Sequence, residues 1–281
     1  MQAKLDEGPA AVCNYNELHA RRAADLINLK GASVLVVGAN TGADCRYFID
    51  WGAKEVHGLD VVPNVGCDYQ ADNVRYFCMS AEAMQLPNNY YDLVYCFATM
   101  EHVPDIVAAF REMTRVTKPG GFIYSVASPL WNSRSGHHMA CLAPHPWIHL
   151  RMGKQEMVRY CKSDGIEGER GLSIESIVSY VLDSTEFNRR PARDYTQAVA
   201  TIPNVLIVSN LLYNEPESAV PEDLRTELAR KGISHDELRA VTHEFVAIKR
   251  PLTWKQRIVG TTRRLVRVAR SQLSGIRRLL K

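Results

Sequence analysis

The stretch VLVVGANTG occupies Val34 to Gly42 and decides the fold. Four apolar residues lead into a glycine, and a second glycine follows four positions later. This pattern is typical of a buried strand that turns tightly into a helix. We therefore predict a strand at Ser33–Val37, a helix at Ala43–Trp51 and a second strand at Glu55–Asp60. Together they form one βαβ unit, in which a helix connects two parallel strands.

The same alternation of strand and helix patterns surrounds this unit. Amphipathic spacing predicts helices at Glu17–Leu29 and Asp105–Val116. Apolar runs predict three more strands, at Val74–Cys78, Leu93–Phe97 and Phe122–Val126, the last of them entered through a KPGG turn at 118–121. Strands that are apolar throughout and alternate with helices indicate a parallel sheet covered on both faces. The predicted fold class is α/β, with a doubly wound, mostly parallel sheet.

Residues 129–200 break this pattern, because their first part is rich in Pro, His and Trp and lacks clear periodicity. Placed after the carboxyl end of a strand, such a segment is predicted to be a substrate lid or insertion. Helical patterns return at 154–163 and 172–183. The remaining elements are two closing strands at Val205–Leu212 and Glu244–Lys249, with a helical insert at 215–243 before the last strand.

Length and composition favour one elaborated domain, which we assign to residues 1–251 of the 281. The seven cysteines are scattered and form no CxxC pair, so neither a disulfide framework nor a zinc knuckle is predicted. No signal peptide or membrane-spanning run is evident in the sequence. A cytoplasmic, reducing compartment is therefore the expectation.

Residues 252–281 carry nine Lys or Arg and no acidic residue. Since the net charge of the chain is +3, residues 1–251 carry −6. On a helix the basic and aliphatic side chains of this tail separate onto opposite sides, which predicts a basic amphipathic helix. We expect this helix to bind an anionic membrane surface, as a peripheral contact at the inner face of the membrane.

The tail has two other possible partners. Its apolar side could instead pack on the domain or on a second copy of the chain, as in a homo-oligomer. Nucleic acid is disfavoured, because Trp254 is the only aromatic residue of the tail and the rest of the chain is acidic.

The glycine turn suggests a ligand site, because ligands of open parallel sheets bind beyond the carboxyl ends of the strands. Gly38 and Gly42 would let the backbone approach a ligand closely. Asp60 ends the second strand, where a carboxylate can accept hydrogen bonds from both hydroxyls of a ribose. These features favour an adenosine-containing ligand, although a tight turn without a ligand explains the glycines alone equally well. A dinucleotide-binding dehydrogenase is disfavoured, because the G-x-G-x-x-G spacing is missing.

Four ordered blocks make the pattern specific: VLVVGANTG, GLD at 58–60, MSAEAMQLPNNYYDLVYCFATMEHVPD at 79–105 and REMTRVTKPGG at 111–121. In order and spacing they resemble class I S-adenosylmethionine-dependent methyltransferases, over about residues 15–128. The resemblance implies a Rossmann-like, seven-stranded fold and S-adenosylmethionine as cofactor. Two positions depart from the family pattern: Val36 stands where an acidic residue is usual, and Asn40 stands where a glycine is usual.

The resemblance also implies roles for individual residues. The turn of Gly38, Ala39, Asn40 and Gly42 would wrap the methionine end of the cofactor. Asp60 would hold the ribose hydroxyls. Ala81 and Glu82 would flank the adenine, and Phe97 would line the site near the sulfonium.

Histidines supply the candidate general bases for an acceptor hydroxyl, since imidazole is best tuned to take a proton near neutral pH. His102 follows the fourth strand, and His137 and His138 lie in the insertion, with His145 and His149 nearby. No metal site is predicted, because the spacing of these histidines matches no metal motif.

The aromatic and polar composition of residues 129–150 suits a sugar acceptor, and the segment loosely resembles bacterial methyltransferases of cell-surface polysaccharides. The predicted activity is therefore O-methylation of a sugar hydroxyl on a surface or lipid-linked glycan. The alternatives are N- or C-methylation of a small molecule and a cofactor-binding pseudoenzyme that serves as a scaffold.

Overall fold

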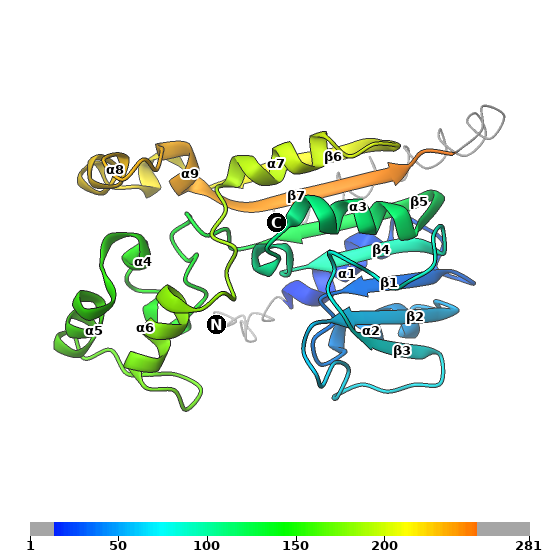
Figure 1. Ribbon diagram of the computed structural model, residues 1–281, viewed down its shortest axis with the longest axis horizontal. Coiled ribbons are helices and arrows are strands. Elements are labelled where there is room, and N and C mark those ends of the chain that lie inside the picture. The colour runs from blue at the N-terminus through cyan, green and yellow to red at the C-terminus, as the bar shows by residue number, and fades with distance from the viewer. Residues whose placement is uncertain (1–13, 252–281) are drawn as a thin grey trace, which may run out of the picture.

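The computed structural model describes residues 14–251, and the predicted amphipathic tail at 252–281 lies outside them. Seven strands form one sheet in the order β3-β2-β1-β4-β5-β7-β6 (Figure 1). β7 runs antiparallel to both of its neighbours, and the other paired strands are parallel. The strands are β1 (Ser33–Val37), β2 (Glu55–Asp60), β3 (Val74–Cys78), β4 (Tyr91–Phe97), β5 (Thr117–Ala127), β6 (Val205–Asn214) and β7 (Ala240–Lys249). The predicted doubly wound α/β class is confirmed.

Helices cover the sheet and extend beyond one of its edges. They are α1 (Tyr15–Ala24), α2 (Ala43–Asp50), α3 (Ile106–Val116), α4 (Ile148–Arg151), α5 (Lys154–Ser163), α6 (Ile174–Asp183), α7 (Ala192–Ala200), α8 (Glu222–Ala229) and α9 (His235–Arg239). Short 3-10 turns lie at η1 (Met100–His102), η2 (Ala140–Leu142) and η3 (Glu217–Ala219). Within residues 14–251, no helix has both the length and the apolar character needed to cross a membrane.

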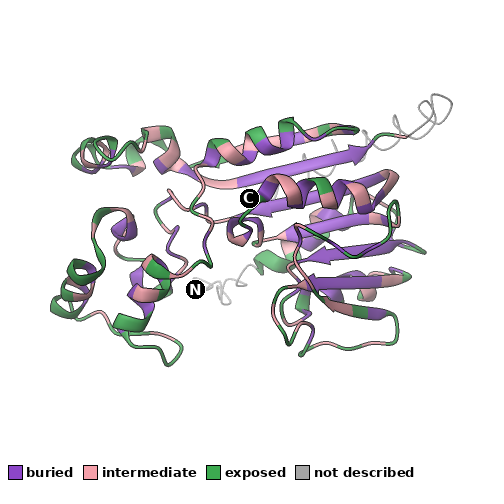
Figure 2. Ribbon diagram, viewed as in Figure 1, coloured by how far each residue is buried: buried purple, intermediate pink, exposed green. Residues whose placement is uncertain are grey.

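The central strands are buried on both faces, as their apolar runs predict (Figure 2). In β1, successive side chains point to opposite faces of the sheet. Val34 and Val36 therefore join the core under α1 and α2, and Leu35 and Val37 join the core under α3 and α7. The run of apolar residues that opens the quoted stretch thus supplies both cores of the fold.

Several element boundaries differ from the predictions. α1 is shorter than the predicted helix at 17–29: it begins after Asn14, whose side chain caps the backbone N–H of Glu17, and it ends at Ala24. β5 begins at Thr117, because Thr117 pairs with Tyr91; the register then shifts, and the next pair is Leu93 with Phe122, so the extra residues 118–121 belong to β5. The predicted KPGG turn is therefore part of the strand.

The insertion has cores of its own. Residues of η2, α4, α5 and α6 pack into one apolar cluster, and Trp147 packs with α8 and α9 in another. Neither α4 nor α7 is anticipated by the sequence. α7 lies within the predicted insertion 129–200, yet it packs into the core of the sheet through side chains such as Tyr195 and Val199. The insert predicted at 215–243 contains α8 and α9 and ends at Arg239, because β7 begins at Ala240.

The two inserted segments gather at one edge of the molecule. α4, α5 and α6, together with α8 and α9, lie on the side toward which the parallel strands run (Figure 1). This is the edge where ligands of open α/β sheets bind.

Candidate active site

The glycine turn after β1 can be built only from glycine at its two ends. Gly38 and Gly42 have φ angles of 79° and 99°, in the left-handed region. A Cβ on Gly38 would lie 1.9 Å from Thr99 Oγ1, and one on Gly42 would lie 2.4 Å from the Tyr76 hydroxyl oxygen. Asn40 between them is also left-handed, at φ 45°, which asparagine tolerates better than most residues. The departure at Asn40 from the family's glycine is therefore compatible with the turn.

Asp60 ties this turn to the end of β2. Its Oδ2 accepts a hydrogen bond from the Asn40 backbone N–H at 2.9 Å. Its Oδ1 accepts from the backbone N–H groups of Val61 and Val62, at 2.7 and 3.3 Å. Since an ionised carboxylate has about four acceptor positions, this one retains capacity for a further donor such as a ribose hydroxyl. Ala39 is buried against the same strand and donates its N–H to the Leu59 carbonyl.

Ala81 and Glu82 lie in the loop after β3. Ala81 is buried in the core, and both carboxylate oxygens of Glu82 have partners within the chain. Oε1 accepts from the Asp105 backbone N–H at 2.6 Å, and Oε2 accepts from the Ser80 hydroxyl at 3.0 Å. Glu82 thereby links this loop to the start of α3. Its expected contact with adenine stays a prediction.

Phe97 ends β4 and stacks on His19 of α1, with ring centroids 4.4 Å apart. His19 Nδ1 also lies 2.8 Å from the Tyr124 hydroxyl, and burial lowers the pKa of this imidazole to about 4. No sequence signal assigns a role to His19, because its partner Tyr124 lies 105 residues later in the chain. The fold thus places a neutral histidine beside the aromatic ring expected near the sulfonium.

Glu101 lies in η1, directly after β4, and is buried. Asn188 of the insertion fixes this turn, because its side chain donates to the Met100 and Val103 carbonyls and its backbone N–H donates to the Glu101 carbonyl. Glu101 Oε1 accepts from the Ser128 backbone N–H at 3.3 Å, whereas Oε2 is buried and has no hydrogen-bond partner among residues 14–251. Burial raises the pKa of this carboxyl to about 8.

The fold brings His102 and His138 together next to Glu101. Their ring centroids are 5.2 Å apart. His102 Nδ1 lies 2.8 Å from the Glu186 carbonyl oxygen, and His138 Nε2 lies 2.9 Å from the Pro129 carbonyl oxygen. Burial, reinforced by the neighbouring His102, lowers the pKa of His138 to about 4. One donor atom from each of the three side chains lies within 4.8 Å of the other two.

His137, the third candidate base, lies elsewhere. It is 1% exposed, its Nδ1 accepts from the Met139 backbone N–H, and burial lowers its pKa to about 4. Its nearest imidazole is His149, with centroids 5.4 Å apart, and His149 is held by the Trp131 carbonyl. This environment is that of a core residue, so the catalytic prediction for His137 has less structural support than those for His102 and His138.

An aromatic group of the insertion packs against the cluster formed by Glu101, His102 and His138. The Phe187 ring centroid lies 5.4 Å from that of His102 and 5.0 Å from that of His138. Trp131 and Tyr180 contact the same phenylalanine, with ring centroids 5.5 and 5.4 Å from that of Phe187. The insertion thus contributes a group of three aromatic rings, which meets the cluster through Phe187.

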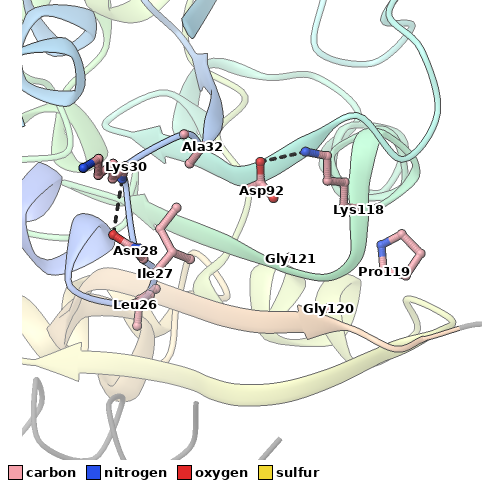
Figure 3. A pocket seen from close by; sticks show the side chains of 11 residues that line it. Leu26, Ile27, Asn28, Lys30, Ala32, Asp92, Lys118, Pro119, Gly120 and Gly121 are labelled. Atoms are coloured by element: carbon pink, nitrogen blue, oxygen red, sulfur yellow. Dashed lines mark hydrogen bonds and ion pairs between the residues drawn. The ribbon is translucent and has the colours of Figure 1, made fainter. Parts of the chain in front are cut away.

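A cavity lined by residues 26–28 and 30–32, Asp92 and 118–121 lies at the opposite edge, where β1 and β4 begin (Figure 3). Two of its three charged side chains pair with each other, since Lys118 Nζ lies 2.7 Å from Asp92 Oδ2. The ends of the strands that carry the glycine turn and the histidines point away from it. We therefore place the candidate site at the carboxyl edge.

Comparison with known proteins agrees with this architecture. Residues 35–125 match the family model described as a methyltransferase domain. A ubiquinone biosynthesis O-methyltransferase of Nitrosospira multiformis is 32% identical over 117 residues, which are 39% of this chain and 46% of that protein. The chain thus spans about half the length of this curated relative.

Solved structures share the fold at low sequence identity. An S-adenosylmethionine-dependent methyltransferase from Mesorhizobium loti aligns with a TM-score of 0.50 and 16% identity, over 81% of this chain and 95% of that one. A Haemonchus contortus phosphoethanolamine N-methyltransferase 2, in complex with S-adenosyl-L-methionine, aligns with a TM-score of 0.52 and 15% identity, over 85% and 53%. Together with the match of residues 35–125 to a methyltransferase domain, these structures show that the chain shares the fold of S-adenosylmethionine-dependent methyltransferases.

Proposed function

We propose that this chain, which carries a class I methyltransferase domain, transfers the methyl group of S-adenosylmethionine to a hydroxyl oxygen. One observation carries the choice of a hydroxyl: Glu101, His102 and His138 form a polar cluster directly after β4. The cluster is close to the glycine turn, because Thr99, two residues before Glu101, contacts Gly38. An acceptor in this position would lie beside polar groups that can assist the loss of its proton.

The cofactor is already activated as a sulfonium, so the protein has to align the two reactants and handle the acceptor's proton. Gly38, Asn40 and Gly42 would leave room for the methionine part, and Asp60 would hold the ribose. The spare acceptor capacity of the Asp60 carboxylate supports this role. Val36, where the family has an acidic residue, cannot contribute a charge, so the turn backbone and Asp60 carry more of the binding.

For the acceptor, we propose a sugar hydroxyl on a surface or lipid-linked glycan. Trp131, Tyr180 and Phe187 form an aromatic wall against which the apolar face of a sugar ring could pack. A hydroxyl of a small molecule is the second candidate, and the O-methyltransferase name of the relative favours it.

The test is to incubate the full chain with methyl-labelled S-adenosylmethionine and a fractionated cell extract. We expect label in a glycan fraction as an acid-stable methyl ether, and none in a parallel reaction with the Asp60→Ala variant. Label in small molecules as an ether would select the second candidate. Label on nitrogen or carbon would contradict O-methylation, and cofactor binding without any transfer would indicate a pseudoenzyme.

A further inference from the structure

The cluster of Glu101, His102 and His138 has the donor set of a metal site. It combines one carboxylate with two imidazoles, and one potential ligand atom from each lies within 4.8 Å of the others. Two histidines and one carboxylate are the ligands found in metal sites that keep open coordination positions. No metal site is predicted from the spacing of the histidines, because these three residues come from two segments of the chain that only the fold brings together.

The hydrogen bonds of the two histidines leave one nitrogen of each ring available. A backbone carbonyl can only accept, so His102 Nδ1 must donate to Glu186 and His138 Nε2 must donate to Pro129. In a neutral imidazole the other nitrogen then carries a free lone pair, which is Nε2 in His102 and Nδ1 in His138. Histidine ligands of metals are commonly oriented by this kind of bond from the second ring nitrogen.

The third donor is a carboxylate oxygen that lacks a partner. Glu101 is 3% exposed, and its Oε2 has no hydrogen bond within the described residues, while Oε1 is held by the Ser128 backbone. A buried polar oxygen without a partner is costly, and a cation would satisfy it. Phe187 packs against both imidazoles and supplies the apolar shell that limits access of water.

We propose that Glu101, His102 and His138 bind a divalent first-row metal ion, through Oε2, Nε2 and Nδ1 respectively. The role of this ion rests on the proposed methyl transfer: the acceptor hydroxyl would occupy an open coordination position on it. Coordination would lower the pKa of the hydroxyl, which releases its proton to solvent. The oxygen then bonds to the methyl carbon, and the carbon–sulfur bond breaks with its electron pair remaining on sulfur.

The experiment measures metal binding by the untagged full chain after dialysis against a chelator. Co²⁺ is titrated and followed by its visible absorption, and Zn²⁺ is titrated by calorimetry. We expect one equivalent of either ion to bind. Glu101→Gln and His138→Ala should each weaken binding by at least about tenfold, since even losing an outer partner of a ligand costs that much.

His145→Ala is the matched control, because this histidine lies in the same insertion but contacts Tyr160 and Asp164 instead of the cluster. It should leave metal affinity unchanged. Circular dichroism and S-adenosylmethionine affinity verify that each variant is folded. Failure of the stripped chain to bind either ion, or equal affinity in the control and cluster variants, would overturn the site.

Activity separates this inference from the proposed function. Loss of methyl transfer on chelation, with recovery when the ion is returned, supports the assignment of the metal to the reaction. Full transfer in the presence of chelator would overturn that assignment and leave methyl transfer standing. Stoichiometric metal binding without transfer to any acceptor would instead contradict the proposed function, while the metal site would stand.

Discussion

Replacing Gly38 with alanine tests how tightly the turn after β1 is packed. The new Cβ would lie 1.9 Å from Oγ1, 2.5 Å from Cγ2 and 2.7 Å from Cβ of Thr99. These distances are too short for any contact, so Thr99 would have to move. Its hydroxyl would then lose the 2.9 Å hydrogen bond that it donates to the Phe97 carbonyl.

Gly52→Ala provides a control that separates strain from contact. Gly52 has a φ of 94°, and nothing lies within 4 Å of a Cβ placed there. Both variants carry the cost of a left-handed alanine, about 1–2 kcal/mol. Gly38→Ala should cost a further 1–3 kcal/mol, roughly, because the site is overpacked.

Urea denaturation of both variants measures the difference in the free energy of unfolding. Adding Thr99→Ala to Gly38→Ala removes the two nearest atoms and should recover part of the extra loss, as expected for directly coupled residues. Equal destabilisation by Gly38→Ala and Gly52→Ala, or no recovery in the double variant, would refute the packing of this turn.

Three further predictions concern a buried histidine, an arginine with several hydrogen bonds, and the histidines of the candidate site. Burial lowers the pKa of His243 to about 4, so between pH 6.5 and 4 the unfolded chain binds more protons than the folded chain, and stability falls as the pH is lowered. In urea titrations, the fall should be shallower in His243→Gln by up to about 1.4 kcal/mol per pH unit, and equal slopes in the two proteins would contradict this. Arg115→Lys should lose about 1–3 kcal/mol of unfolding free energy, because the Arg115 guanidinium donates at once to the Glu112 carboxylate and to two backbone carbonyls. Arg46→Lys is the control and should change the unfolding free energy little, because Arg46 pairs with Asp50 at an exposed site; similar losses in the two variants would argue against the Arg115 hydrogen bonds. Steady-state kinetics of His138→Ala should show turnover reduced far more than cofactor affinity, and His137→Ala should mainly lower the melting temperature; full turnover in His138→Ala would remove that residue from the site.

The sheet was predictable from the sequence because its central strands are buried on both faces. The apolar runs of β1 and β4 have no polar face to confuse with a surface element, and the glycines mark the turn that follows β1. The start of β5 was missed, because Lys118 to Gly121 reads as a turn and only pairing with β4 extends it. α7 was assigned to the insertion for a related reason: its place in the main core depends on contacts with distant strands.

The site was only partly predictable. The glycine turn, Asp60 and His102 were identified because they follow strand ends. Glu101 directly precedes His102 in the block at 79–105, so its position after β4 could also have been predicted from the sequence. The place of His138 could not be foreseen, since it depends on the Pro129 carbonyl and on how the insertion folds back.

The central claim is that S-adenosylmethionine binds at the carboxyl edge of the sheet, and calorimetric titration of the cofactor tests it most directly. Asp60→Asn should weaken binding by about tenfold or more, because a hydrogen bond to a charged group contributes roughly 1.5–3 kcal/mol. Asp92→Asn changes a carboxylate of the cavity at the opposite edge and should leave affinity unchanged. Loss of binding in Asp92→Asn with full binding in Asp60→Asn would contradict the account.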